Sequence, residues 1–240
     1  MSSDDPTRVR PAPPLPAEPL RLVVSPESTV SAELVTPPQA TAALVFAHGA
    51  GAGMHHRFMA EFSAGLCARG VASLRYQFPF MEAGSRRPDP PARAQAAVRA
   101  AVGEANRRCP GVPLFAGGKS FGGRMTSQAE AAAPLPGVLG LVFVGFPLHP
   151  AGKPAIERAD HLARVERPML FLQGTRDELA DADLIGGVAA GLGERATLHF
   201  LDDADHAFHV RRSSGRNDAQ VLEDMLDTTV AWMTAQTESS

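Results

Sequence analysis

The sequence is poor in cysteine, in long apolar runs and in excess charge of either sign. Only two of its 240 residues are cysteines, which excludes a disulfide scaffold and a four-cysteine zinc site. Its 23 Lys and Arg nearly balance 26 Asp and Glu, and a formal net charge of −3 argues against a dedicated nucleic-acid binder. The longest apolar run, Val138 to Leu148, is shorter than the roughly 18 residues that span a bilayer. We therefore predict a protein with neither nucleic-acid nor membrane partners.

The overall composition is that of an ordinary globular protein. Hydrophobic residues make up 44% and charged residues 20%, so the chain contains enough apolar side chains for a core. Residues 1–19 are rich in Pro and charge and have no periodicity, which indicates a flexible leader. This segment also lacks the apolar stretch of a secretory signal, and we predict a cytoplasmic location. The remaining residues, 20–240, have the length of one domain.

Short apolar runs alternate with segments of helical periodicity along this domain. Alternating strands and helices predict an α/β protein with one mostly parallel sheet, helices on both faces and only a short cap between residues 147 and 167. The predicted strands are 20–25, 29–35, 42–47, 71–76, 112–116, 138–146, 168–172 and 196–201, and the predicted helices are 57–69, 90–108, 121–133, 181–192 and 217–235. In such sheets the chemistry lies at the carboxyl ends of the strands.

A G-x-S-x-G motif follows the strand predicted at 112–116. Gly118 and Gly122 flank Ser120, and a helix is predicted to start at Phe121. A sharp strand–turn–helix presents a serine hydroxyl as a nucleophile, and glycines on both sides avoid clashes with neighbouring backbone. A phosphate-binding P-loop is the competing interpretation of Gly118-Lys119-Ser120, but that motif requires glycine where Pro113 stands.

A serine nucleophile needs a base and an orienting carboxylate, and both follow later strands. Asp177 comes after the strand at 168–172, and His206 comes after the strand at 196–201. The order Ser120, Asp177, His206 is the order found in α/β-hydrolases. Alternatives remain open on the second loop: Asp202, Asp203 and Asp205 for the carboxylate, and His209 for the base.

Backbone N–H groups are expected to bind the oxyanion of the intermediate. The residue after the nucleophile, Phe121, is the first candidate donor. The second is Ala50, with Gly49 and Gly51 as neighbouring choices, because a glycine-rich loop follows the early strand at 42–47. His48, His55 and His56 lack the spacing and the partners of a metal site, and we expect neither a metal nor another cofactor.

These motifs together resemble the α/β-hydrolase superfamily. Within it the chain is similar to bacterial hydrolases related to testis-expressed protein 30 and the NSL complex subunit, near dienelactone hydrolases. The resemblance covers nearly everything after residue 20 and includes the runs 54–59, 75–80, 118–124 and 146–150. It implies an α/β-hydrolase fold and a Ser-His-Asp triad. Dienelactone hydrolases use cysteine as nucleophile where this chain has Ser120, so lactone chemistry is not implied.

The expected activity is hydrolysis of small or medium carboxylic esters by a carboxylesterase-like serine hydrolase. The ester is the only small-molecule partner predicted; protein partners stay undefined. The alternative is a hydrolase-fold interaction protein with weak or no catalysis, because a fold and a triad do not determine biological role. Five apolar residues are expected to line the substrate pocket: Phe80, Met125, Phe146, Leu148 and Phe208.

Overall fold

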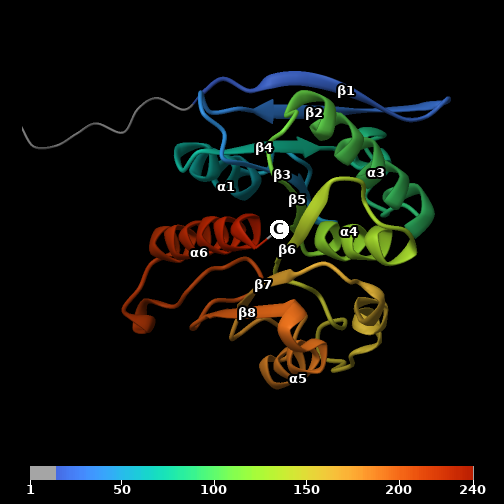
Figure 1. The fold of residues 1–240 in the computed structure, drawn as a ribbon. Coiled ribbons are helices and arrows are strands. Elements are labelled where there is room, and N and C mark those ends of the chain that lie inside the picture. Colours follow the sequence, from blue (N-terminus) through green and yellow to red (C-terminus); the bar gives the residue numbers. More distant parts are fainter. Residues whose placement is uncertain (1–14, 240) are drawn as a thin grey trace, which may run out of the picture.

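The core of the protein is an eight-stranded, mostly parallel sheet (Figure 1). The computed structural model describes residues 15–239, and its strand order is β1-β2-β4-β3-β5-β6-β7-β8. Strand β2 pairs antiparallel with β1 and with β4, and the other neighbouring strands of this sheet pair parallel. The strands are β1 Glu18–Ser25, β2 Ser28–Val35, β3 Ala42–Ala47, β4 Val71–Tyr76, β5 Leu114–Lys119, β6 Val138–Val144, β7 Met169–Gly174 and β8 Ala196–Leu201.

Helices cover both faces of the sheet. In Figure 1, α1 and α6 lie on one side of the sheet, and α3 and α4 lie on the other. The α-helices are α1 Arg57–Ala68, α2 Pro79–Glu82, α3 Pro91–Arg108, α4 Phe121–Ala132, α5 Ala182–Leu192 and α6 Asp218–Glu238. Short 3₁₀ helices occupy Glu157–Arg164, Gly193–Arg195 and Arg212–Ser214.

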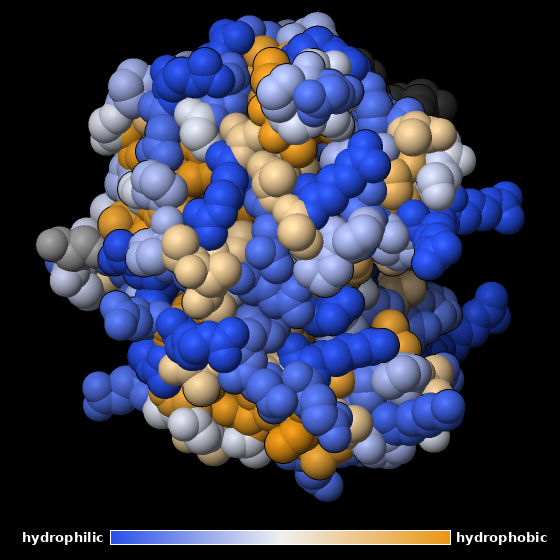
Figure 2. Space-filling view, turned by 90° about the vertical axis from the view of Figure 1, so that its right-hand side faces the viewer, coloured by the Kyte–Doolittle hydropathy of each residue, from blue (hydrophilic) through white to orange (hydrophobic). Residues whose placement is uncertain are grey.

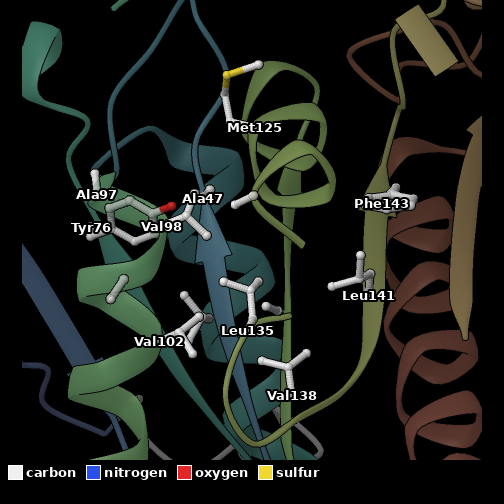
Figure 3. Packing of buried hydrophobic residues seen from close by; sticks show 14 of the residues in the cluster. Ala47, Tyr76, Ala97, Val98, Val102, Met125, Leu135, Val138, Leu141 and Phe143 are labelled. Carbon is white, nitrogen blue, oxygen red and sulfur yellow. The ribbon is translucent and has the colours of Figure 1, made fainter. Parts of the chain in front are cut away.

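Strand periodicity divides the buried side chains into two cores. Along β3, Ala43, Val45 and Ala47 join the core under α3 and α4, whereas the intervening Leu44 and Phe46 join the core under α1 and α6. Successive side chains of a strand point to opposite faces, so a strand covered on both sides is apolar throughout. Figure 3 shows the first core, where side chains of α3 lie beside Tyr76 of β4.

The fold class predicted from the sequence is confirmed, and β3, β4 and β8 have the predicted bounds. The main difference is at β5, which continues through Gly117 and Gly118 to Lys119 rather than ending at Ala116. Both glycines pair with β3 and with β6. Glycine is a weak strand former, but there is no space for a side chain: a Cβ on Gly117 would lie 1.9 Å from the carbonyl oxygen of Val142.

The predicted leader overlaps the sheet slightly. Strand β1 begins at Glu18, so the last two residues of the segment predicted as leader belong to a strand. Residues 15–17 are exposed and have no regular secondary structure, and residues 1–14 of the predicted leader lie outside the described residues. Within 15–239, no helix has the length and hydrophobicity needed to cross a membrane.

Hydrophilic side chains cover most of the face shown in Figure 2, so the layer that contains α3 and α4 is largely polar towards solvent.

Candidate active site

Ser120 lies in the turn between β5 and α4. Its backbone has φ 51° and ψ −115°, a region that residues with a side chain rarely adopt. The flanking glycines make this turn possible, because a Cβ on Gly118 or on Gly122 would lie 2.5 Å from the carbonyl oxygen of Ala47. The sequence therefore folds into a sharp turn against β3, with Ser120 at the carboxyl end of a central strand.

His206 lies in the loop after β8, and its ring reaches back to Ser120. The Nε2 atom of His206 is 2.9 Å from the Oγ of Ser120, and its Nδ1 atom is 2.7 Å from Oδ2 of Asp177. An ionised carboxylate only accepts hydrogen bonds, so Nδ1 carries the proton. Nε2 is then free to accept the hydroxyl proton of Ser120. The structure brings these three residues together in one chain of hydrogen bonds.

Asp177 lies in the loop after β7, and several hydrogen-bond donors hold its carboxylate in place. Its side chain is fully buried, and besides His206 it accepts hydrogen bonds from Nε2 of Gln173 at 2.6 Å and from the backbone N–H of Leu179 at 2.8 Å. Gln173 is itself fixed, because its Oε1 accepts from the N–H of Phe146. The sequence analysis missed Gln173, although a glutamine directly after the apolar run 169–172 and before a glycine is a recognisable signal.

The other acids and the second histidine of the His206 loop have different partners. Asp203 pairs with Arg211 and Arg176. Asp205 accepts hydrogen bonds from the N–H groups of Ala207 and His209, which shapes the turn that carries His206. His209 is exposed and bonds to Asp218 of α6 at 2.9 Å. Asp202 is exposed as well. Of the alternatives left open by the sequence, Asp177 and His206 are the pair that reaches Ser120.

The glycine-rich loop after β3 lies beside Ser120. A Cβ on Gly49 would be 3.8 Å from the Cβ of Ser120, and half-buried Ala50 lines the pocket described below. Phe121 is the first residue of α4, and the N–H groups of the first helical turn have no acceptor within their own helix. Of the two predicted donor residues, Phe121 therefore directly follows Ser120, and Ala50 lines the same pocket as Ser120.

His48 anchors this loop from inside the protein. It is fully buried, with Nε2 accepting from the N–H of Phe78 at 3.0 Å and Nδ1 2.7 Å from the carbonyl oxygen of Gly49. Burial lowers the pKa of His48 to about 4, so the ring is neutral at neutral pH. A neutral ring with its proton on Nδ1 satisfies both contacts.

Buried His48 should make the fold sensitive to acid. The unfolded chain takes up a proton at His48 below pH of about 6.5, whereas the folded chain does so only near a pKa of about 4. The contribution of neutral His48 to the free energy of unfolding is about 3 kcal/mol; it is fully present above pH 6.5 and is lost as the pH falls towards 4. Urea unfolding between pH 8 and 4 measures the decline.

Two variants provide the comparison. In His48→Gln the free energy of unfolding should be lower at pH 8 but should depend less on pH between 6.5 and 4. His209→Gln is the control, because the hydrogen bond to Asp218 raises the pKa of exposed His209; a raised pKa stabilises the fold at low pH, so removal of this side chain should not weaken the acid-dependent decline. If the free energy of unfolding depended equally on pH in His48→Gln and in the unmodified protein, the acid-dependent decline could not be assigned to His48.

An open pocket of about 790 Å³ lies over Ser120 and His206. Its walls come from the loop after β3, the start of α1, the β5–α4 turn and the loops after β7 and β8. The lining residues are Gly49, Ala50, Gly51, Ala52, His56, Phe58, Met59, Lys119, Ser120, Arg176, Glu178, Leu179, Asp205, His206 and Ala207. The connection between β6 and β7, where a lid would be inserted, contributes none of them.

The structure corrects the predicted pocket walls. The five apolar residues named from the sequence are buried by other side chains and do not line this pocket, because they fill the two cores beneath it. These residues are Phe80, Met125, Phe146, Leu148 and Phe208. The residues that do form the apolar walls, such as Phe58, Met59 and Leu179, belong to loops and to the start of α1.

A second serine–histidine pair lies away from the pocket. The Oγ of Ser127 in α4 is 2.7 Å from Nε2 of His161, and both residues are buried. Burial, together with the nearby Arg124 and Arg164, lowers the pKa of His161 to about 4. Neither residue lines the pocket over Ser120, so this pair serves as an internal comparison for the reactivity of Ser120.

Comparison with known proteins agrees with the fold. The pattern of the alpha/beta hydrolase domain family matches residues 40–234, and the chain belongs to that family. Among solved structures, it is similar to an α/β serine hydrolase without lid from Xanthomonas campestris, with a TM-score of 0.69 and 21% identity over 92% of this chain and 97% of that one. A dienelactone hydrolase from Anabaena variabilis has a TM-score of 0.72 and 17% identity over 92% and 98%. At such identities these two structures support the shared fold alone.

Proposed function

We propose that the protein is a serine hydrolase that cleaves carboxylic esters of small or medium acyl size. The observation that carries the proposal is the chain of hydrogen bonds from Ser120 through His206 to Asp177, which opens into the 790 Å³ pocket. Each member has the chemistry its role needs: a hydroxyl on a sharp turn, an imidazole with an unprotonated Nε2 and a buried carboxylate.

The proposed reaction proceeds through an acyl-enzyme. Ser120 attacks the ester carbonyl while His206 accepts the hydroxyl proton, and the N–H groups of Phe121 and Ala50 bind the oxyanion. When the intermediate collapses, His206 donates its proton to the leaving alcohol. Water then attacks the acyl-enzyme by the same route and restores Ser120. Asp177 keeps the proton on Nδ1 throughout and stabilises the imidazolium.

The size of the ester follows from the shape of the site. The pocket is open on one side, and the 3₁₀ helix Glu157–Arg164 that replaces a longer lid does not reach it. An amphipathic lid that shelters a long acyl chain is absent from this part of the described structure, so we propose short or medium acyl groups. Within the family, we further propose kinship with the hydrolases related to testis-expressed protein 30, supported by the run from Gly118 to Arg124.

A panel of p-nitrophenyl esters from acetate to palmitate tests this function. We expect turnover that is highest for short and medium chains and weak for palmitate, with a thioester and an anilide as comparisons for the leaving group. A fluorophosphonate probe tests the nucleophile independently of substrate. If the folded protein neither turns over any ester nor reacts with the probe, the alternative of a hydrolase-fold interaction protein is favoured.

Replacing Asp177 with asparagine should lower kcat by about 10⁴-fold, as expected when a triad loses its carboxylate but keeps its shape. The asparagine amide can donate to Nδ1, which would move the ring proton to Nε2, where Ser120 needs an acceptor. Ester hydrolysis by the purified variant measures the effect, and Asp205→Asn is the matched control on the His206 loop. A fully active Asp177→Asn with an inactive Asp205→Asn would reassign the carboxylate.

A further inference from the structure

Lys119 sits between the nucleophile turn and the histidine loop. It is the last residue of β5 and directly precedes Ser120, yet its ammonium donates a hydrogen bond to the backbone carbonyl oxygen of His206. The same ammonium lies 4.4 Å from the ring centre of Phe208 and 5.4 Å from that of Phe58. A cation over aromatic faces is attracted by the ring quadrupole, so the side chain has a defined place rather than a free, solvated one.

The missing side chain of Gly145 leaves room for this arrangement. Gly145 follows β6 with φ 68°, and a Cβ there would lie 3.4 Å from Nζ of Lys119 and 3.4 Å from Cε1 of His206. The ammonium and the imidazole therefore border the same small space. Burial lowers the pKa of Lys119 to about 8, although the carboxylates of Asp177 and Asp205 oppose the decrease. At neutral pH the side chain remains mostly a cation.

We propose that Lys119 is the positioning residue for His206: its ammonium ties the backbone of the histidine loop to the strand end that carries Ser120. The inference rests on the proposed function, because it assigns a role in bringing the base to the nucleophile. His206 lies in an irregular loop beyond β8, without the regular hydrogen bonds of the sheet. The bond from Lys119 is a direct link between this loop and the β5–α4 turn, and it helps to set the distance from Oγ to Nε2.

The proposal predicts a selective loss of turnover. Lys119→Met keeps the length and the apolar stem but removes the ammonium, and a misplacement of about 1 Å at a reacting group costs about 100-fold in rate. We expect kcat for p-nitrophenyl acetate to fall about 100-fold with KM unchanged and with the thermal midpoint close to that of the unmodified protein. Lys153→Met makes the same chemical change at an exposed residue, the other lysine of the sequence, and should leave kcat unchanged.

Chemical rescue separates positioning from a purely structural contribution. Lys119→Cys should lose turnover in the same way, and treatment with 2-bromoethylamine should restore most of it, because the product is an ammonium on a side chain of nearly the same length. The treated unmodified protein controls for reaction at Cys67 and Cys109, which are both buried. The Cys variant also provides the test if Lys119→Met does not fold.

Each outcome supports or overturns one of the two proposals. If the unmodified protein lacks both ester turnover and labelling by fluorophosphonate, the proposed function fails before Lys119 is considered. If that protein is active but Lys119→Met keeps its kcat, or if alkylation of Lys119→Cys restores nothing, the positioning role is wrong. A raised KM with unchanged kcat would instead identify Lys119 as a group that binds substrate and would also overturn the positioning role.

Discussion

Ser120→Ala is expected to abolish covalent labelling by a fluorophosphonate and to lower kcat for p-nitrophenyl esters by about 10⁶-fold, the loss expected when a triad nucleophile is removed. The reason is that Oγ of Ser120 is the hydroxyl within 2.9 Å of Nε2 of His206. Alanine retains the Cβ, so the turn at φ 51° meets no new steric demand and the fold should be preserved. Intact-mass spectrometry, circular dichroism and ester kinetics measure the three effects.

The control for this experiment is Ser127→Ala. Ser127 also hydrogen-bonds to a histidine, but the pair is buried and does not line the pocket, so this variant should keep the labelling and the turnover. Peptide mapping of the labelled protein should place the adduct on Ser120. An adduct on Ser127, or labelling that survives in Ser120→Ala, would show that the nucleophile has been misassigned.

His206→Ala should reduce kcat about as strongly as Ser120→Ala, because members of a triad act as one unit. Without the imidazole, the hydroxyl of Ser120 has no base to accept its proton and the transition state has no acid for the leaving alcohol. The double variant Ser120→Ala/His206→Ala should therefore be no slower than either single variant. Initial rates with p-nitrophenyl acetate at neutral pH measure all three proteins.

His209→Ala is the matched control three residues away. His209 is exposed and bonds to Asp218, so its loss should slightly loosen the contact between the loop and α6 and cost far less in kcat. If His209→Ala were the more damaging change, the base would have to be reassigned and the hydrogen bond between His206 and Ser120 would carry no catalytic meaning.

The elements and the central geometry could be predicted because they depend on local sequence. The run Ala42–Ala47 is short and apolar throughout, so both its existence and its bounds are readable as a strand covered on two faces. Gly118 and Gly122 around Ser120 define a sharp strand-to-helix turn that is typical of a serine nucleophile. The order of Asp177 and His206 then follows from which strand each residue succeeds.

The pocket walls and the supporting polar contacts could not be predicted in the same way. Whether a phenylalanine faces a core or a pocket depends on side chains far away in the sequence, as Phe208 illustrates by packing among α1 and α6 rather than facing the pocket. The contacts of Gln173 and Lys119 likewise join strand ends to loops that are 27 and 87 positions away along the chain. The four-residue helix α2 is shorter than the window over which helical periodicity can be detected.

The order of strands in the sheet has a consequence for how the molecule is made. Ser120 and His206 are 86 positions apart, and β8, the strand that leads to His206, docks only on β7 at the edge of the sheet. Parallel pairing of distant segments is slow, because the entropy cost of closing a long loop comes before the contacts that compensate for it. A growing chain on the ribosome that ended before residue 206 would hold the turn around Ser120 without its base. The hydrogen-bonded chain around Ser120 is thus completed only after residue 206 has been made, while the unpaired edge of β7 in such a nascent chain stays open to pairing with other chains until β8 covers it.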